Sequence, residues 1–259
     1  MADLSSAIGK VPYRLALAGG WIDQPFVSSL NPDGVGSMVV VSIEPTVRFM
    51  ERCGMATGTR KVAQRMWGAE LPAGDRWELM RELYYAENAE LTDPSGSQDM
   101  AGLLFPGVNR LDYDASVEGG WFPCHVESCL DPGVAEWLER VIHVIPVAPR
   151  PPGYNPLDER NLDPEIVRCL GRTGADCYSA ILNRDLPGLG DSFNRCMSYW
   201  ESLLPCVVRH QTLELDLCAL RACYEDRYAG AMYSGCGGGY LYVVSEEPVP
   251  GGFHIKVRR

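Results

Sequence analysis

Three glycine-bearing loops are the stretches of this sequence best suited to binding an anion. They are AGGWID at residues 18–23, GMATGTR at residues 54–60 and SGCGGG at residues 234–239. Glycine lets consecutive backbone N–H groups turn towards an anion, and a helix that follows such a loop adds the positive end of its dipole. None of the three is a Walker A motif or a strand-linked GxGxxG motif, so no single loop specifies a nucleotide.

The loop at residues 54–60 offers more than backbone, because it leads into a predicted helix and carries two hydroxyl groups. Thr57 and Thr59 could donate hydrogen bonds to phosphate oxygens, and Thr59 could also ligate a metal ion. An ordinary capped helix start accounts for the same residues without a ligand. Spacing alone leaves both interpretations open.

Cysteine and histidine do not indicate a further site. Cys124, His125 and Cys129 come nearest to a metal cluster, but three candidates at irregular spacing do not match the ligand patterns of zinc sites. Cys236 lies within the third loop with no histidine near it in sequence, so we predict that it fills space and is not a nucleophile.

The elements that must position these loops follow from residue patterns. Strands are predicted over residues 12–20, 36–50 and 141–149, on both sides of the loop at 234–239, and in the final FHIKVRR. Helices are predicted after the loop at 54–60, over 74–90 with Asp75 as N-cap, and over about 164–184, 189–204 and 215–226. A Pro-rich exposed loop is predicted at 150–164. The mixture indicates an α+β fold with strands concentrated at the two ends and a boundary near residue 138.

Composition restricts the class of protein. The chain has 259 residues, of which 46% are apolar and 22% charged, and its formal net charge is −11. A globular protein with an acidic surface is expected, and neither nucleic acid nor an anionic membrane is a favoured partner. No apolar run reaches membrane-spanning length, MADLSSAIGK lacks the apolar core of a signal peptide, and the ten cysteines form no CxxC pair. We therefore expect reduced thiols in a cytoplasmic protein.

Taken in order, these segments resemble the motifs of the galactokinase–homoserine kinase–mevalonate kinase–phosphomevalonate kinase (GHMP) superfamily. PYRLALAGGWIDQP is similar to its Arg-led strand followed by Gly-Gly and an Asp, GMATGTRK to its phosphate loop, and SGCGGGYLYVV to its last glycine motif. ENAELTDPSGSQDMAGLLFPGVN resembles its Glu-bearing helix and Gly-x-x-Asp segment. The resemblance covers most of the chain and looks closest to the branch acting on heptose phosphate or fucose.

The resemblance implies a two-lobed α+β fold. The N-terminal lobe, residues 1–138, would hold the phosphate loop and the catalytic Asp, and the C-terminal lobe, residues 139–259, would hold the last glycine motif. The N-terminal lobe is expected to be abbreviated, because only residues 24–53 separate Asp23 from Gly54. Members of the family usually have a longer stretch there, which supplies much of the wall around the adenine base.

The resemblance also implies roles for individual residues. Asp99 would be the catalytic carboxylate, Arg14 would steady charge on the transferring phosphate, and Glu87 and Thr59 would ligate Mg²⁺. Glu87 extends the buried stripe of its helix, where a carboxylate needs a partner. The remaining expected contacts are those of ATP with Gly54, Thr57, Gly58, Thr59 and Arg60, and those of the acceptor with Trp21, Asp23, Gly235, Gly237 and Gly238.

The implied activity is that of a small kinase that transfers the γ-phosphoryl group of ATP, with Mg²⁺, to a hydroxyl of a sugar or sugar phosphate. A catalytically degenerate ligand-binding or regulatory protein on the same fold is the alternative, supported by the short segment before Gly54, the missing serine run in GMATGTR, and Ser97 at a position where close relatives often have a basic residue. An amino alcohol or a mevalonate-like acid is a third acceptor class, and Asp23 disfavours an acid by charge repulsion.

Ordinary structural roles compete with each assignment. Asp99 could cap a helix, Glu87 could be a solvated residue at a helix end, Asp23 could be a turn residue before Pro25, and Arg14 could pair with a surface acid. The oligomeric state is not indicated.

Overall fold

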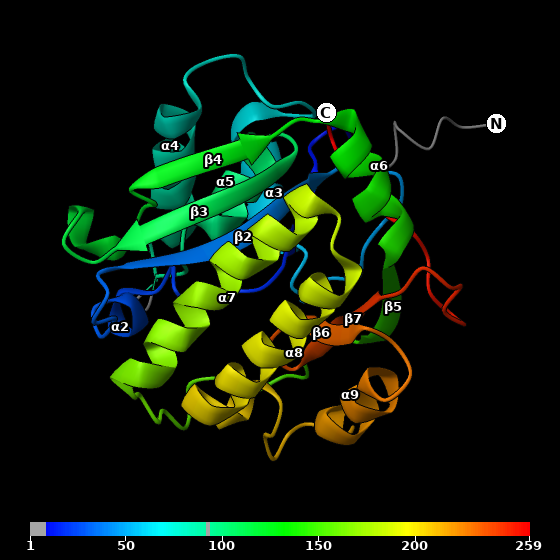
Figure 1. Ribbon diagram of the computed structural model, residues 1–259. Coiled ribbons are helices and arrows are strands. Elements are labelled where there is room, and N and C mark those ends of the chain that lie inside the picture. Colours follow the sequence, from blue (N-terminus) through cyan, green and yellow to red (C-terminus); the bar gives the residue numbers. More distant parts are fainter. Residues whose placement is uncertain (1–8, 92–93) are drawn as a thin grey trace.

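The computed structural model describes residues 9–91 and 94–259, and Figure 1 shows their arrangement. Most of MADLSSAIGK lies outside the described residues. Residues 92 and 93, within ENAELTDPSGSQDMAGLLFPGVN, do so too. Among the helices that the structure describes, none combines the length and apolar character needed to cross a membrane.

Two antiparallel sheets with helices packed on them organise the fold, which confirms the predicted α+β class. The first sheet has the strand order β1-β2-β3-β4. Its strands are β1 (Tyr13–Ala16), β2 (Val35–Ile43), β3 (Val108–Asp114) and β4 (His125–Cys129). The second sheet has the order β5-β7-β6 and comprises β5 (Ile142–Ala148), β6 (Gly230–Gly235) and β7 (Gly238–Val244).

Two long helices join the sheets. Helix α7 (Pro164–Asn183) contacts β2 and β3, α8 (Leu186–Leu203) contacts β6 and β7, and the two helices pack on each other (Figure 1). The other helices are α2 (Pro25–Ser28), α3 (Thr57–Trp67), α4 (Arg76–Asn88), α5 (Gln98–Leu104), α6 (Pro132–Val141) and α9 (Leu217–Glu225), with 3₁₀ turns at Glu118–Gly120 and Pro205–Val207.

Aspartate side chains cap the N-termini of α4, α6, α7, α8 and α9. Asp75, the predicted N-cap, accepts hydrogen bonds from the backbone N–H groups of Trp77 at 2.8 Å and Glu78 at 3.0 Å. In α6, α7 and α8 a proline follows within two residues, where no helical N–H is needed. The sequence therefore marks its helix starts clearly, although α8 begins at Leu186 rather than at residue 189.

Several predicted elements need correction. Strands β3 and β4 and helix α6 were not predicted, so the strands are not concentrated at the two ends of the chain. Strand β2 ends at Ile43 and does not reach residue 50. The final FHIKVRR forms no strand, because Phe253 bridges Val144 of the second sheet and Val257 bridges Ile43 of the first. A segment that crosses between two sheets cannot extend a ladder in either.

The predicted boundary at residue 138 falls inside α6, shortly before β5 begins the second sheet. The two sheets are thus built from the two predicted lobes in turn, and the division itself stays a prediction. The short connection noted before Gly54 is visible directly, because only α2 and β2 lie between β1 and the loop at 54–60.

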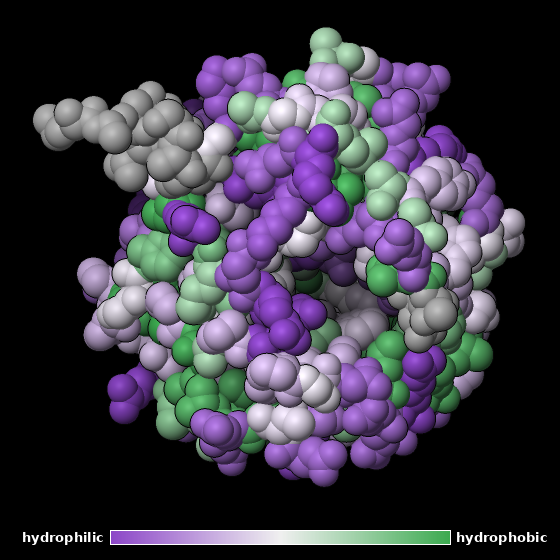
Figure 2. All heavy atoms as spheres, turned by 180° about the vertical axis from the view of Figure 1, so that it is seen from behind, coloured by the Kyte–Doolittle hydropathy of each residue, from purple (hydrophilic) through white to green (hydrophobic). Residues whose placement is uncertain are grey.

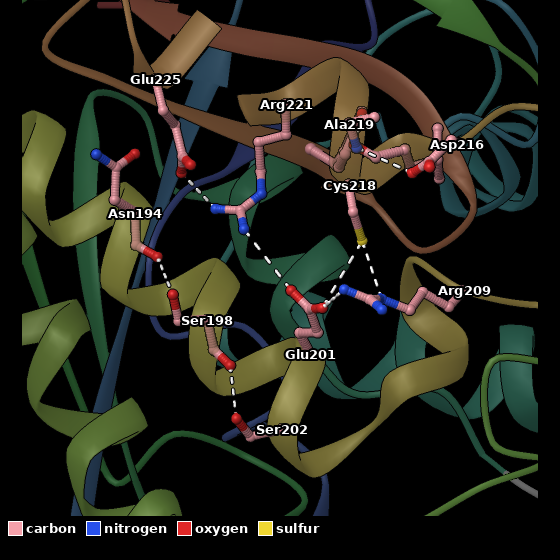
Figure 3. Close-up of polar contacts among 12 residues, drawn as sticks. Asn194, Ser198, Glu201, Ser202, Arg209, Asp216, Cys218, Ala219, Arg221 and Glu225 are labelled. Atoms are coloured by element: carbon pink, nitrogen blue, oxygen red, sulfur yellow. Dashed lines mark hydrogen bonds and ion pairs between the residues drawn. The ribbon is translucent and has the colours of Figure 1, made fainter. Parts of the chain in front are cut away.

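Ion pairs hold α9 against α8 (Figure 3). Arg221 pairs with Glu225 on its own helix and lies 3.8 Å from Glu201 of α8. Glu201 also pairs with Arg209, whose Nε donates to the Cys218 sulfur at 3.2 Å. Each charge in this cluster has an opposite partner, so we assign the cluster to helix packing.

Candidate active site

Two cavities lie next to each other, and both halves of the chain line them. The first cavity has a volume of about 210 Å³ and includes Asp23 and Trp200, and the second has a volume of about 460 Å³ and includes Thr57 and Glu87. The residues that line both are Arg14, Gly54, Ser95, Asp99, Arg150 and Pro156. Figure 2 shows the face opposite α7 and α8, which is hollowed near its centre and mostly hydrophilic around the opening.

An ion pair between Arg14 and Asp99 lies where the cavities meet. Arg14 comes from β1 and also donates to the Gly54 carbonyl at 2.9 Å. Asp99 comes from the first turn of α5, and its second oxygen accepts a hydrogen bond from the Thr59 hydroxyl at 3.3 Å. The Arg14 side chain is 5% exposed and that of Asp99 is 27% exposed, so the carboxylate is the more accessible partner. Burial lowers the pKa of Arg14 to about 10, which leaves it charged at neutral pH.

These contacts exclude the N-cap interpretation of Asp99, and its catalytic role stays a prediction. The N-cap position of α5 belongs to Ser97, and the Asp99 side chain bonds to Arg14 and Thr59 instead. Arg14 is buried in the same contact and is not paired with a surface acid. Three segments that are far apart in sequence therefore meet at one carboxylate.

Asp23 is buried in the first cavity. It is 1% exposed, and neither carboxylate oxygen has a hydrogen-bond partner among the described residues. Burial raises the pKa of Asp23 to about 6. The positive charge of Arg14 and nearby polar groups of Gln98, which do not meet hydrogen-bond geometry, offset this rise only in part. Gly96 makes room for the carboxylate, since a Cβ there would lie 1.8 Å from Asp23 Oδ2. Trp21, which has the unusual φ of 79° for a bulky residue, lines the same cavity.

Glu87 and Thr59 fit a divalent cation. Glu87 Oε2 is buried without a hydrogen-bond partner in the described part of the chain, and burial raises the pKa of this carboxyl while the Thr59 hydroxyl partly opposes the rise. An orphaned carboxylate oxygen beside a hydroxyl is a donor set that Mg²⁺ takes. No three His, Cys, Asp or Glu side chains converge within the described ranges, so water and substrate phosphates would complete the coordination.

The loop at 54–60 has the backbone form of a cradle. Gly54 has a φ of 73°, and Ala56, at the N-cap of α3, has a φ of 55° and no side-chain group that could cap the helix. The first N–H groups of α3 thus lie at the rim of the second cavity, which Thr57, Gly58 and Lys61 line. An anion can be bound there by backbone donors.

Arg60 lies apart from both cavities. Its Nε donates to the Val11 carbonyl at 2.8 Å, and its guanidinium lies 4.3 Å from the centre of the Tyr13 ring. It lines a separate hollow with Tyr13 and Gln64. Its placement packs α3 on β1 and lends no support to the predicted contact with ATP.

Gly54→Ala is expected to destabilise the protein more than Gly153→Ala. Both glycines have a positive φ, 73° and 76°, so an added Cβ costs each about 1 kcal/mol in backbone strain. A Cβ at Gly54 would also lie 2.3 Å from the Ser234 carbonyl oxygen, whereas nothing lies within 4 Å at Gly153. We expect an additional loss of about 2 kcal/mol or more for Gly54→Ala in urea denaturation. Equal losses of stability in Gly54→Ala and Gly153→Ala would show that the loop at 54–60 is not tightly packed against Ser234.

The loop at 234–239 packs against Cys53 and the loop at 54–60. The Ser234 hydroxyl donates to the Cys53 carbonyl at 2.6 Å and accepts from the Tyr240 N–H at 2.9 Å. Gly235, a predicted acceptor contact, lines the first cavity. The Gly237 N–H donates to the Val207 carbonyl at 2.8 Å, and neither Gly237 nor Gly238 lines the two cavities. Of the three predicted glycines, only Gly235 is placed to meet a ligand.

Sequence patterns missed Arg150, Gln98 and Trp200, which also line the first cavity. Arg150 begins the Pro-rich segment that was predicted as an exposed loop, yet it is half-buried at the junction of both cavities. Its position two residues after the strand at 142–148 is the signal that could have identified it. Cys236 is buried and also lines the first cavity. All ten cysteines are free thiols.

Known structures resemble this chain, although no family model and no curated protein sequence matches it. A D-glycero-D-manno-heptose 1-phosphate kinase from Bacteriodes thetaiotaomicron aligns over 96% of both chains with a TM-score of 0.55 and 13% identity. Lactococcus lactis galactokinase complexed with galactose aligns over 92% of this chain and 85% of its own, with a TM-score of 0.56 and 13% identity. Methanococcus jannaschii mevalonate kinase aligns over 91% and 89%, with a TM-score of 0.57 and 10% identity.

The chain has the GHMP-kinase fold. The predicted resemblance is confirmed at the level of the fold, and the similar TM-scores of a heptose kinase, a galactokinase and a mevalonate kinase do not favour one branch. In this GHMP-kinase fold, part of each glycine motif and Asp99 line the two adjacent cavities. The functional roles of these residues stay predictions.

Proposed function

We propose that the protein is a cytoplasmic, ATP-dependent kinase that phosphorylates a hydroxyl group of a sugar or sugar phosphate. The observation that carries this proposal is the Arg14–Asp99 pair at the junction of two cavities. One cavity holds a buried carboxylate, and the other is lined by the loop at 54–60 and Glu87. An acceptor and a phosphate donor could therefore meet at Asp99.

The proposed reaction is a direct in-line transfer. The acceptor oxygen forms a bond to the γ-phosphorus while the bond from that phosphorus to the β-phosphate oxygen breaks, and ADP leaves. Asp99 orients the acceptor hydroxyl and takes its proton. Arg14 offsets charge on the transferring group, and Asp23 accepts hydrogen bonds from the hydroxyl groups of the acceptor.

Glu87 and Thr59 would hold Mg²⁺, which when bound neutralises charge on the donor phosphates. The backbone N–H groups at the start of α3 and the hydroxyl of Thr57 would bind those phosphates. The buried floor formed by Asp23, Gly96 and Trp200 keeps the acceptor end of the site partly closed to water.

ADP release is the direct test. Purified protein supplied with ATP, Mg²⁺ and a panel of sugars and sugar phosphates should release ADP with at least one acceptor. If no acceptor supports ADP release while sugars raise the melting temperature and neither Mg·ATP nor ADP does, the protein is a ligand-binding module on the same fold. The short connection before Gly54 is the observation that favours that second function.

A further inference from the structure

Arg150 is a cation in the candidate site to which the proposed reaction gives no role. It lies two residues after the end of β5, is half-buried and lines both cavities. Its Nε donates to the Cys236 carbonyl at 2.9 Å, and its backbone N–H donates to the Arg52 carbonyl at 3.3 Å. The backbone and the inner nitrogen are thus held in place, which leaves the outer edge of the guanidinium to bind something else.

The space around Arg150 is kept open and its charge is not neutralised. A Cβ at Gly235 would lie 2.9 Å from a terminal nitrogen of Arg150, so the glycine leaves room for the guanidinium. Arg14 is paired with Asp99, whereas no carboxylate in the described part of the chain forms an ion pair with Arg150. In a protein with a net charge of −11, a half-buried arginine at a cavity with no ion-pair partner among the described residues is suited to bind an anion.

The same cavity contains hydrogen-bond acceptors that also have no partner. Both carboxylate oxygens of Asp23 and Oε1 of Gln98 are buried and unbonded within the described residues. Hydroxyl groups satisfy such acceptors, and a phosphate monoester satisfies a guanidinium fork. A single small molecule that carries several hydroxyl groups and a phosphate meets both requirements.

We propose that Arg150 binds a phosphate group on the acceptor, so that the first cavity selects a sugar phosphate over the parent sugar. This inference rests on the proposed function, in which the acceptor is the molecule that receives the phosphoryl group. Arg14 and the loop at 54–60 already face the group to be transferred, and Arg150 reaches the cavity that holds Asp23. Repulsion between Asp23 and an acidic acceptor is countered by this cation.

Binding is measured by calorimetry without nucleotide, so that the result does not depend on catalysis. The probes are inorganic phosphate and a set of aldoses, each compared with its own 1-phosphate and 6-phosphate. The variants are Arg150→Gln, Arg150→Lys, and Arg52→Gln, which removes a charge that lines the second cavity alone. Urea denaturation establishes that each variant is folded.

The wild-type protein is expected to bind at least one sugar phosphate more tightly than its parent sugar. Arg150→Gln should weaken the binding of that phosphate compound by about 10- to 100-fold, as expected for loss of a charge-assisted pair, and should leave the parent sugar unchanged. Arg150→Lys should retain part of the preference, and Arg52→Gln all of it.

Three outcomes would overturn the inference: a wild-type protein without preference for any phosphorylated probe, an Arg150→Gln variant that weakens sugar and sugar phosphate equally, or one that weakens neither. A preference that depends on Arg150 in a protein that never releases ADP would sink the kinase proposal and leave this binding role intact. ADP release with neutral sugars alone would support the kinase proposal and overturn the binding role of Arg150.

Discussion

Asp99→Asn is expected to lower kcat for phosphoryl transfer by at least about 100-fold, with little change in the KM for ATP. Removal of a general base or a hydroxyl-orienting carboxylate has this order of effect. Asparagine has nearly the same shape and keeps an oxygen that Arg14 can bond, so the fold should survive. The measurement is ADP release at saturating ATP with the best acceptor found for the wild-type protein.

The control for this variant is Asp112→Asn. Asp112 pairs with Arg110 at 3.0 Å on β3 and lines neither cavity. Like Asp99→Asn, its substitution removes the negative charge from an aspartate–arginine pair, but away from the cavities. We expect kcat to be unchanged in Asp112→Asn. Activity in Asp99→Asn equal to that of this control would show that Asp99 has no part in the chemistry, whatever the fold.

Asp23→Asn is expected to stabilise the protein at neutral pH and to weaken acceptor binding. Burial raises the pKa of Asp23 from 3.8 to about 6, and a rise of that size corresponds to about 3 kcal/mol of lost stability once the group is ionised. The neutral amide avoids that cost. It also loses a charged acceptor for sugar hydroxyls, so the KM for the acceptor should rise about 10-fold or more.

The sign of the pH dependence distinguishes this explanation from simple repacking. The folded protein keeps the Asp23 proton up to about pH 6, whereas the unfolded chain releases it near pH 3.8. The stabilising contribution of the protonated Asp23 carboxyl, measured as the unfolding free energy of the wild-type protein relative to Asp23→Asn, should therefore be fully present below pH 3.8. It should be lost as the pH rises through about 6. Urea denaturation of both proteins from pH 4 to pH 7.5 measures this difference.

Asp114→Asn is the matched control, because the bonds from the Ser116 hydroxyl and N–H lower the pKa of Asp114 instead. Its substitution should destabilise the protein slightly at neutral pH, opposite in sign to Asp23→Asn. A constant difference between Asp23→Asn and wild type across this pH range would mean that the carboxylate has a partner in the folded state.

Much of the candidate site could be predicted from the sequence because its motifs are local. A glycine with a positive φ, a capping aspartate and a threonine at a helix start each owe their role to neighbours a few residues away. Gly54, Thr57 and Asp75 could therefore be identified from short stretches, and the order of the motifs led to Asp99 and Glu87. Helices α3, α4, α7, α8 and α9 were recognised for the same reason, since apolar spacing and caps are short-range signals.

Other features depend on which segments meet in three dimensions. The burial of Asp23 follows from contact with Gly96, and the turn itself shows no sign of which way its carboxylate points. Strand β4 has an exposed or half-exposed residue at every position, so it lacks the alternation that marks a strand. The final segment looks like a strand by composition and is split between two sheets by its path.

The sequence by itself determined the α+β class, most helix starts, the three glycine loops and the likeness to the GHMP kinases. Only the tertiary structure decided that Asp99 pairs with Arg14, that Arg60 and Gly237 turn away from the cavities, and that Arg150 enters them. The reason is physical: caps and turns are satisfied within a few residues, whereas the charge balance and free space of a cavity depend on contacts between β1, α5, β5 and β6, which the chain brings together only when both sheets have formed.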